Sequence, residues 1–448
     1  MIRPSPRFVF AFQLALAVVI AYALALSFDW ERPHWAVFAV FAIAVPHMGM
    51  SLGRAGQRLA GTIVAAGMAL LIIALFPQDR WLFILSLSSW LALCTYMMVF
   101  SKRSYFWHTA GFIASIIAAT AANTGGNSFM LAIDRTLETS LGIVVYTVVG
   151  LLLWRQPIPA KPPPTVVGPW FFPDVDAVVA ALRVFIIYWV SFLAIIYIPD
   201  FPTGLAFLAP MGPLAMAIAT TPQLPIRSLY MPVALGLLIA SLLYMLVMPV
   251  LSSYTELAAL TFIFALAVSY RYYAPQETVA RLIVLFIFGG LTGISNDQAY
   301  SFGAVSNNLL NWLWVLLMLH LSTLLPVIIR PETRFLRLLE RFNRSAARLQ
   351  ASISADGWLG RWVRAYHRHE ILTIPSKLAM WQPQLSPGLV VPASENLEAL
   401  MQKLRDCQSA FLQMSDAAAT RDEAMTLIKE LEASYAMINW SPWREPRF

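Results

Sequence analysis

The chain has 448 residues, of which 59% are apolar and only 12% are charged. An ordinary soluble domain carries roughly 25% charged residues, so a water-soluble fold could not bury this much apolar surface. The net charge of +7 does not indicate nucleic acid, because most cations fall in short loops on one predicted side of a membrane. Two cysteines exclude a disulfide framework, and no zinc-ligand spacing occurs. The composition therefore predicts an all-α, polytopic membrane protein without a metal or cofactor.

Twelve apolar segments qualify as membrane spans, since a bilayer core needs about 20 residues per helix. The first could be a signal peptide, but it ends in Asp29-Trp30-Glu31-Arg32 without a small-residue cleavage pattern. We therefore interpret it as a retained helix. The predicted spans are Phe8–Phe28, Pro33–Met48, Leu59–Phe76, Trp81–Phe100, Tyr105–Ala122, Phe129–Trp154, Val178–Ile198, Thr203–Thr220, Leu229–Val250, Glu256–Tyr270, Ala280–Ile294 and Val305–Ile329.

Lysine and arginine alternate between the predicted loops in a way that sets the topology. With a cytoplasmic N-terminus, the outer loops receive only Arg32 and Arg80. The inner loops receive twelve cations: Arg3, Arg7, Arg54, Arg58, Lys102, Arg103, Arg155, Lys161, Arg227, Arg271, Arg281 and Arg330. One missed span would invert every later loop, so the alternation favours this helix count. It predicts a multi-pass protein of the cell inner membrane with both termini in the cytoplasm.

The spans fall into two sets of six. We expect a first six-helix repeat at residues 1–155, a Pro-rich cytosolic linker at 156–176 and a second six-helix repeat at 177–330, before a cytosolic helical tail at 331–448. Six is an even number, so both sets enter the membrane from the same face and form a parallel repeat. Chance similarity of two alternating six-helix units is the alternative.

Proline interrupts the second helix of each half. The first half reads Val45-Pro46-His47-Met48-Gly49 and the second reads Ala209-Pro210-Met211-Gly212-Pro213. Proline removes a backbone donor, so each helix should kink or break there. Interrupted segments at matching places point to a transporter's binding site. Pro46, His47 and Pro210 are therefore candidate substrate-lining residues, with a simple packing kink as the alternative.

The sixth helix carries charges near mid-membrane depth, in Asp134-Arg135-Thr136-Leu137-Glu138. Spacings of three and four residues place these charges on neighbouring helix faces. Two acids compete for one guanidinium, so we expect Arg135 to bind an anionic substrate while Glu138, tuned by Asp134, exchanges a proton. The alternative is a permanent Arg135–Glu138 structural pair.

The matching stretch of the second half is polar but uncharged. It reads Asn307-Asn308-Leu-Leu-Asn311. Asn308 and Asn311 are therefore predicted to form an amide-lined wall of the same pathway. Trp35 could stack on an aromatic substrate, although most aromatic residues near span ends should be interfacial anchors.

Several of these residues carry a resemblance to a known family. Trp35, then Arg58-Leu-Ala-Gly61-Thr62 opening the third helix, then Arg135-Thr-Leu-Glu138-Thr-Ser-Leu-Gly142 in the sixth, are similar to the fusaric acid resistance and aromatic acid exporter family. The resemblance covers residues 5–330, by motif in the first half and by architecture in the second. It implies an inner-membrane efflux pump driven by the proton gradient, which exports aromatic carboxylic acids with a periplasmic adaptor (membrane-fusion) protein. It also implies that Arg58, Gly61, Thr62 and Gly142 are motif residues with a structural role.

The chain departs from the family pattern at two places. Larger members carry a big cytosolic domain between their halves, where this chain has only the Pro-rich linker. The second half also lacks an Arg-x-x-Gly-Thr copy, because Arg227 is followed by Ser-Leu-Tyr230-Met231. These departures suggest a distinct, short-linker branch.

The tail shows amphipathic helical patterns. Glu332–Ser352 reads as a basic amphipathic helix near the anionic inner leaflet. Ser394–Ser415 and a second helix from Thr420 resemble a hairpin. His367-Arg-His369-Glu370 does not predict a metal site, because a spacing of two residues does not align ligands on one helix face. We interpret the tail as regulatory or dimer-forming.

Together these patterns predict a proton-coupled efflux transporter for small organic acids. Its expected partners are the acid, protons, membrane lipids, an adaptor protein and a second copy of the chain. A gated anion channel of similar six-helix units is the alternative. A membrane-embedded enzyme would need a nucleophile or metal cluster, and the sequence offers neither that nor an ATP-binding motif.

Overall fold

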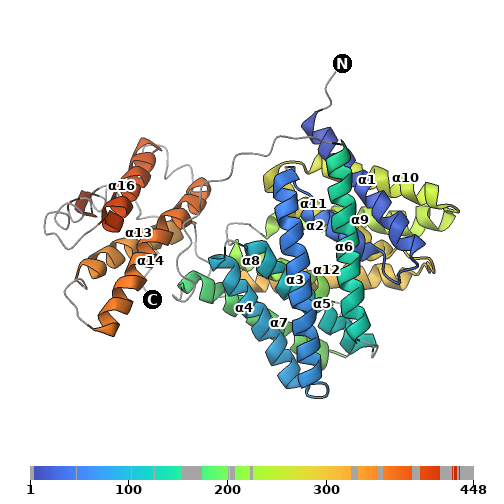
Figure 1. The fold of residues 1–448 in the computed structure, drawn as a ribbon, viewed down its shortest axis with the longest axis horizontal. Helices are drawn as coiled ribbons and strands as arrows, with labels where there is room; N and C mark the ends of the chain where they lie inside the picture. The colour runs from blue at the N-terminus through green and yellow to red at the C-terminus, as the bar shows by residue number, and fades with distance from the viewer. Residues whose placement is uncertain are drawn as a thin grey trace. The chain divides into compact units, whose positions relative to one another are not determined.

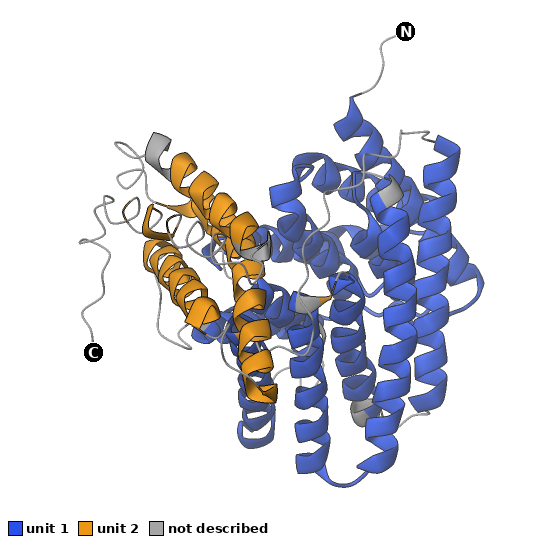
Figure 2. Ribbon diagram, turned by 60° about the vertical axis from the view of Figure 1, so that its left-hand side comes forward, with its two compact units in different colours: residues 1–99, 103–162, 175–323 blue, residues 100–102, 163–174, 324–448 orange. Residues whose placement is uncertain are grey.

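The computed structural model describes residues 5–46, 48–101, 103–124, 128–153, 174–199, 201, 207–221, 226–323, 331–351, 357–385, 394–413, 426, 428–430 and 433. The chain divides into two compact units (Figure 2). The first comprises Met1–Val99, Arg103–Pro162 and Val175–Thr323, and the second Phe100–Lys102, Pro163–Asp174 and Leu324–Phe448. Within the described residues the secondary structure is helical and contains no strand. The predicted linker, 156–176, lies outside the described residues up to position 173.

Twelve α-helices occur in the described part of the first unit (Figure 1). Seven helices there are long and apolar enough to cross a membrane, so the prediction of an all-α, multi-pass membrane protein is confirmed. How many of the twelve do cross stays a prediction. The helices are α1 (Pro6–Ser27), α2 (His34–Ile43), α3 (Met48–Leu75), α4 (Arg80–Phe100), α5 (Ser104–Thr124), α6 (Ser128–Leu153), α7 (Val175–Tyr197), α8 (Leu208–Thr220), α9 (Arg227–Leu242), α10 (Tyr254–Arg271), α11 (Thr278–Thr292) and α12 (Phe302–Thr323).

Helix α3 begins eleven residues before the predicted span, at Met48 instead of Leu59. The prediction that Arg54 and Arg58 lie in an inner loop is therefore wrong. The stretch holds Gly49, Gly53 and Gly56, which suggested a loop, but no proline interrupts it. A glycine inside a helix costs only about 1 kcal/mol, so the helix continues through them.

The two proline-containing segments differ from each other. In the first half α2 ends at Ile43, before Pro46, as a helix does when a proline follows. In the second half α8 runs from Leu208 through both Pro210 and Pro213, so the predicted break at Pro210 is wrong. Pro210 lies in the first helical turn, where the missing backbone N–H would have no partner in any case.

The helices of the first unit pair in a pattern that repeats at an offset of six. Helix α3 packs on α5 as α9 packs on α11, and α2 packs on α6 as α8 packs on α12. Helix α1 packs on α2 and α6, as α7 packs on α8 and α12. The two sets meet where α5 packs on α8, α11 packs on α2, and α1 packs on α10. A six-helix repeat would produce this pairing, which supports the proposed parallel repeat.

Small residues let α3 and α5 approach closely. A Cβ atom at Gly61 would lie 2.8 Å from the Phe106 carbonyl oxygen and 2.9 Å from the Thr109 Cβ atom. Ala65 and Ala69, one and two turns further along α3, are fully buried.

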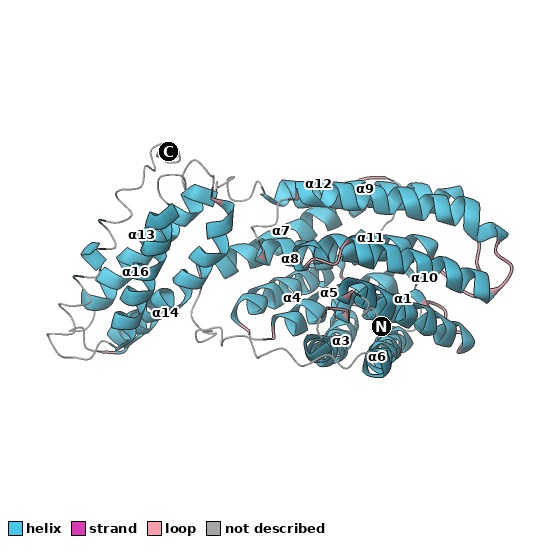
Figure 3. Cartoon of the chain, turned by 90° about the horizontal axis from the view of Figure 1, so that it is seen from above, coloured by secondary structure: helices cyan, strands magenta, loops and turns pink. Residues whose placement is uncertain are grey.

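In the second set, α9 and α12 run side by side (Figure 3). Helix α9 continues into a π-helical turn, η2 (Leu243–Val247).

The second unit is a helical domain with its own core. It contains α13 (Pro331–Ala351), α14 (Trp358–Trp381) and α16 (Ser394–Gln413), and its core includes Phe335, Leu339, Phe342, Ile371, Ile374, Leu400 and Leu404. Helix α13 is the basic amphipathic helix of the sequence, but α14 covers its apolar face. Its apolar face is therefore buried within the unit and not free to contact lipid, and the position of the helix near the anionic inner leaflet stays a prediction. Helix α14 was not singled out by the sequence, and the predicted helix from Thr420 lies largely outside the described residues.

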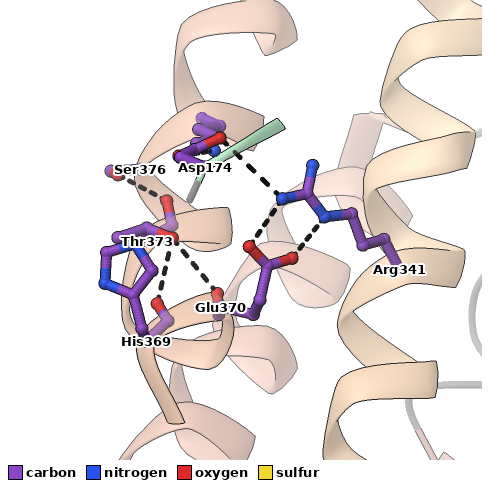
Figure 4. Close-up of polar contacts among 7 residues, drawn as sticks. Asp174, Arg341, His369, Glu370, Thr373 and Ser376 are labelled. Atoms are coloured by element: carbon purple, nitrogen blue, oxygen red, sulfur yellow. Dashed lines mark hydrogen bonds and ion pairs between the residues drawn. The ribbon is translucent and has the colours of Figure 1, made fainter. Parts of the chain in front are cut away.

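Buried charges tie this unit together. Arg341 of α13 forms two hydrogen bonds to the Glu370 carboxylate of α14, one of them from Nη2 to Oε1 at 2.5 Å, and lies 3.8 Å from Asp174 (Figure 4). Lys377 also pairs with Asp174. Glu370 and Asp174 are both buried, and each has a cationic partner, which a buried carboxylate requires. The network holds the segment just before Val175 against α13 and α14.

Candidate functional site

The charged residues of α6 divide between its two faces. Arg135 and Glu138 are 3% and 2% exposed and face the helices of the first unit, whereas Asp134 is exposed beside Ile133 and Leu137. Helix geometry causes the division, because Arg135 and Glu138 are three residues apart while Asp134 is rotated by about 100° from its neighbour. The structure therefore brings together two of the three predicted charges.

Arg135 and Glu138 form an ion pair that leaves hydrogen-bonding capacity unused. The Arg135 Nη1 atom lies 2.8 Å from the Glu138 Oε2 atom. The N–H directions nevertheless miss the oxygen, so these two atoms and Arg135 Nε have no hydrogen-bond partner in the part of the chain that the structure describes. The attraction between the two opposite charges stabilises the pair, but the free energy needed to remove both ions from water remains as a cost. A guanidinium with unpaired N–H groups can donate hydrogen bonds to a second carboxylate.

Trp35 of α2 supports this guanidinium from one face. The Arg135 Cζ atom lies 4.3 Å from the centre of the Trp35 ring, a cation–π contact worth about 2 kcal/mol when desolvated. This contact does not itself use the N–H groups in conventional hydrogen bonds. His34, the preceding residue, has a buried Nδ1 atom without a partner among the described residues.

Gly142 makes the contact between α6 and α2 possible. A Cβ atom at this position would lie 2.1 Å from the Ala36 carbonyl oxygen and 2.8 Å from the Ala39 Cβ atom. Any larger residue would push α6 away from α2, and with it Arg135 from Trp35. The motif residues of the sixth helix therefore act together: Gly142 sets the separation at which Arg135 meets Trp35.

The carbonyl groups freed at the end of α2 are bonded by protein side chains. Ser51 donates to the Val45 oxygen at 3.2 Å and accepts from the Val45 nitrogen at 3.3 Å. Tyr105 donates to the Ala42 oxygen at 3.3 Å and in turn accepts from Arg58 Nη1 at 3.3 Å. Arg281 of α11 donates to the Ala44 oxygen at 3.1 Å. These bonds satisfy backbone groups that lipid could not.

A similar contact crosses between the halves at α8. The imidazole Nε2 atom of His108, on α5, lies 3.0 Å from the Pro213 carbonyl oxygen. Thus α5 of the first set supports α8, as α11 of the second set supports α2 through Arg281. Pro46 and Pro210 are both partly buried near these contacts, and His47 lies outside the described residues.

The remaining predicted residues lie on other helices. Asn308 donates to the Ala304 oxygen of its own helix at 3.0 Å, and Asn311 is buried. Both are on α12, which packs on α7, α8, α9 and α11, whereas Arg135 is on α6, which packs on α1, α2, α3 and α5. Thr62 of α3 is fully buried, and its hydroxyl oxygen has no partner within the described residues.

Arg281 is the buried residue that the sequence analysis missed. It was counted among the inner-loop cations although it is the second residue of the predicted span Ala280–Ile294, and it lies inside α11 and is fully buried. The signal for it was available, because an arginine one residue into an apolar helix is expensive unless the fold supplies partners. Tyr105, which links Arg58 to α2, had no comparable signal.

Comparison with known proteins adds family evidence for the first half. The uncharacterized transporter YdhK of Escherichia coli K12 is 30% identical over 118 residues, which cover 25% of this chain and 18% of that protein. The p-hydroxybenzoic acid efflux pump subunit AaeB of Enterobacter cloacae is 32% identical over 154 residues, 32% of this chain and 24% of that protein. The AaeB protein of Yersinia enterocolitica is 30% identical over 162 residues, 33% of this chain and 25% of its own length. These alignments span no more than a quarter of the relatives' lengths, and no solved structure matches the chain.

A family model matches residues 7–162, under the description fusaric acid resistance protein family. The motif residues that carried the resemblance in the sequence all lie inside this match: Trp35, Arg58, Gly61, Thr62, Arg135, Glu138 and Gly142. The resemblance is therefore confirmed. Residues 7–162, which hold α1 to α6, are therefore similar to the fusaric acid resistance protein family.

Proposed function

We propose that this protein is an efflux transporter that exports small organic acids, aromatic carboxylic acids in particular, in exchange for protons. The observation that carries the proposal is the Arg135–Glu138 pair, buried in α6 with N–H groups of the arginine left without acceptors. A stable structural pair would be expected to use those N–H groups. The names of the matched relatives, an efflux pump subunit for p-hydroxybenzoic acid and a transporter, support the substrate class and the activity.

The chemistry follows from competition for one guanidinium. In the empty protein the Glu138 carboxylate neutralises Arg135. A substrate carboxylate that reaches the free edge of the guanidinium can form two parallel N–H···O bonds, which Glu138 does not form in this structure. Exchange requires that acid and proton occupy the pair in turn. After the acid leaves on the outer side, the buried Glu138 carboxylate takes up a proton there. Loss of that proton on the inner side restores the Arg135–Glu138 pair, so that an acid leaves as a proton enters.

Trp35 and Asp134 have supporting roles in this scheme. Trp35 fixes the guanidinium plane, so that its edge points to one place. Asp134 is exposed, and its negative charge would act on the Arg135–Glu138 pair electrostatically, without direct contact. Asn308 and Asn311 would line the pathway from α12, on the second set of helices.

Transport by purified protein in proteoliposomes tests the proposal. With an acidic outside compartment and p-hydroxybenzoate inside, the wild-type protein should export the acid, and Glu138→Gln should abolish the pH-driven part. Arg135→Lys keeps the charge but loses the planar fork, so the KM for the acid should rise by roughly 10–150-fold, the equivalent of about 1.5–3 kcal/mol.

Asp134→Asn is the matched control, because it removes a carboxylate from the exposed face of the same helix turn. It should retain pH-driven export within a few-fold of wild type. Export that is unchanged in Glu138→Gln would refute the exchange role. Anion currents that need no proton gradient would instead indicate a gated anion channel, the alternative function.

We further propose a place and partners for the transporter. The loop cations support a location in the cell inner membrane with both termini in the cytoplasm. A periplasmic adaptor protein and a second copy of the chain are proposed partners. Cysteine-labelling of single-cysteine variants in spheroplasts tests the orientation: a residue in the loop after α1 should react from outside, and a residue after α6 should not.

A further inference from the structure

Two buried arginines lie at the end of α2 without a carboxylate. Arg58 of α3 is 2% exposed and Arg281 of α11 is 0% exposed, which makes them the largest fully buried side chains in the described structure. Neither forms an ion pair within the described residues, and the Nε atom of each has no hydrogen-bond partner there. Buried charges are normally paired or neutralised, so two unpaired guanidiniums require an explanation.

Both side chains converge on the same backbone segment. Arg281 Nη2 donates to the Ala44 oxygen at 3.1 Å and Nη1 to the Tyr272 oxygen at 3.2 Å. Arg58 Nη1 donates to the Tyr105 hydroxyl, which donates to the Ala42 oxygen. The residues come from positions 223 apart in the sequence and from both sets of helices. They meet at a single helix terminus.

Helix capping accounts for only part of this charge. The C-terminal end of a helix carries the equivalent of roughly half a negative charge, which one cation near it can balance. Here the Arg281 guanidinium bonds the end of α2 directly and the Arg58 guanidinium is linked to it through Tyr105. A third arginine, Arg54, has its Cζ atom 5.6 Å from the centre of the Tyr105 ring. The local charge is therefore well above zero in the absence of an anion.

Aromatic rings surround these cations. The Arg58 Cζ atom lies 5.9 Å from the centre of the Phe112 ring, and the Arg281 Cζ atom lies 4.8 Å from that of Phe10. An inorganic anion would gain little from such surroundings. A carboxylate attached to an aromatic or apolar body would satisfy both the arginines and the rings.

We propose that the end of α2 is a second anion site, formed by Arg58 and Arg281, which binds a small carboxylate with an apolar or aromatic body. Trp35, which stacks on Arg135, and Ala42–Ala44 lie seven to nine residues apart along the chain, so the two sites are roughly 10–14 Å apart along α2. With the orientation proposed above, this second site is on the cytoplasmic side. A role as the site where the acid first binds before export rests on the proposed function, whereas anion binding at this site does not.

The closed packing has a consequence for binding. Because Arg281 has no exposed surface, a carboxylate can reach it only when the end of α2 separates from α11. Binding at this site therefore favours a more open contact between the two sets of helices.

Equilibrium binding of benzoate to the purified full-length protein in detergent tests the site. Wild type should bind two benzoates per chain, Arg135→Met one, Arg281→Met one, and the double variant none. A loss of all binding in Arg135→Met would overturn the proposal, as would unchanged stoichiometry in a folded Arg281→Met protein. These outcomes are independent of export, which Glu138→Gln abolishes if the proposed function holds.

Photolabelling tests the site without any substitution of Arg58 or Arg281. 4-Azidobenzoate, irradiated with the wild-type protein and mapped by mass spectrometry, should label the peptide that contains Phe112 or the end of α2, and this label should persist in Arg135→Met. Excess benzoate present during irradiation should prevent labelling, whereas chloride at the same concentration should not. Absence of label from both peptides would overturn the proposal, and displacement by chloride at the same concentration would show a halide site instead.

Discussion

Gly142→Ala should destabilise the protein and impair the site together. The added Cβ atom would lie 2.1 Å from the Ala36 carbonyl oxygen, and ordinary van der Waals contact begins at 3.4 Å, so α6 and α2 must separate by about 1.3 Å. Because the obstacle is backbone, no rotamer change relieves it. Overpacking of this kind costs about 1–3 kcal/mol. The same displacement moves Arg135 away from Trp35, so acid affinity should fall even in protein that folds.

Equilibrium unfolding in mixed micelles measures the stability change, and benzoate binding measures the effect on the site. Gly67→Ala is the matched control, since this glycine also lies within a membrane helix, α3, but a Cβ atom there would meet nothing within 4 Å. The control should be neutral or up to about 1 kcal/mol more stable, because alanine is the better helix former. If Gly142→Ala and Gly67→Ala have the same unfolding free energy, the close approach of α6 to α2 is wrong.

Three further predictions concern other parts of the chain. Glu370→Ala removes the carboxylate that pairs with Arg341 and should lower the stability of the tail unit by about 3 kcal/mol. The control Glu340→Gln alters an exposed residue and should change this stability little. Hydrogen exchange of the full-length protein measures both effects. Burial, and to a lesser extent the nearby Arg348, lowers the pKa of His367 in the folded tail. Below the ordinary histidine pKa of about 6.5 the unfolded tail therefore binds more protons than the folded tail. The tail should lose stability as the pH falls from 7 to 5, and His367→Gln should reduce this loss. Ser253→Ala removes the capping box that begins α10 and should cost about 1 kcal/mol, with faster exchange confined to the first turn of that helix; uniform exchange across α10 would contradict it.

The helix positions were accessible from the sequence because they depend on local properties. Apolar runs of span length fixed most helix ends within a few residues, and Pro46 marked the end of α2. The exceptions have local causes too. Glycines at the start of α3 suggested a loop, and Pro210 suggested a break, but glycine is tolerated inside a helix and proline in its first turn.

The Arg135–Glu138 pair was equally predictable, since three residues on a helix determine which side chains are neighbours. Which face they occupy was not, because all sides of α6 carry apolar residues. Only packing against α2 buried this pair and left Asp134 exposed. Likewise the apolar face of α13 was evident from its spacing, but α14 rather than lipid covers it.

The convergence of Arg58 and Arg281 is the clearest case that only the tertiary structure decided. Sequence periodicity describes relations within one helix, and nothing in it relates a residue of α3 to one of α11. Arg281 directly and Arg58 through Tyr105 are linked to the end of α2, because both sets of helices pack around it. A proline follows this helix end, whose carbonyl groups need donors. Local sequence therefore determined where helices form and end, and long-range packing determined which charges they enclose.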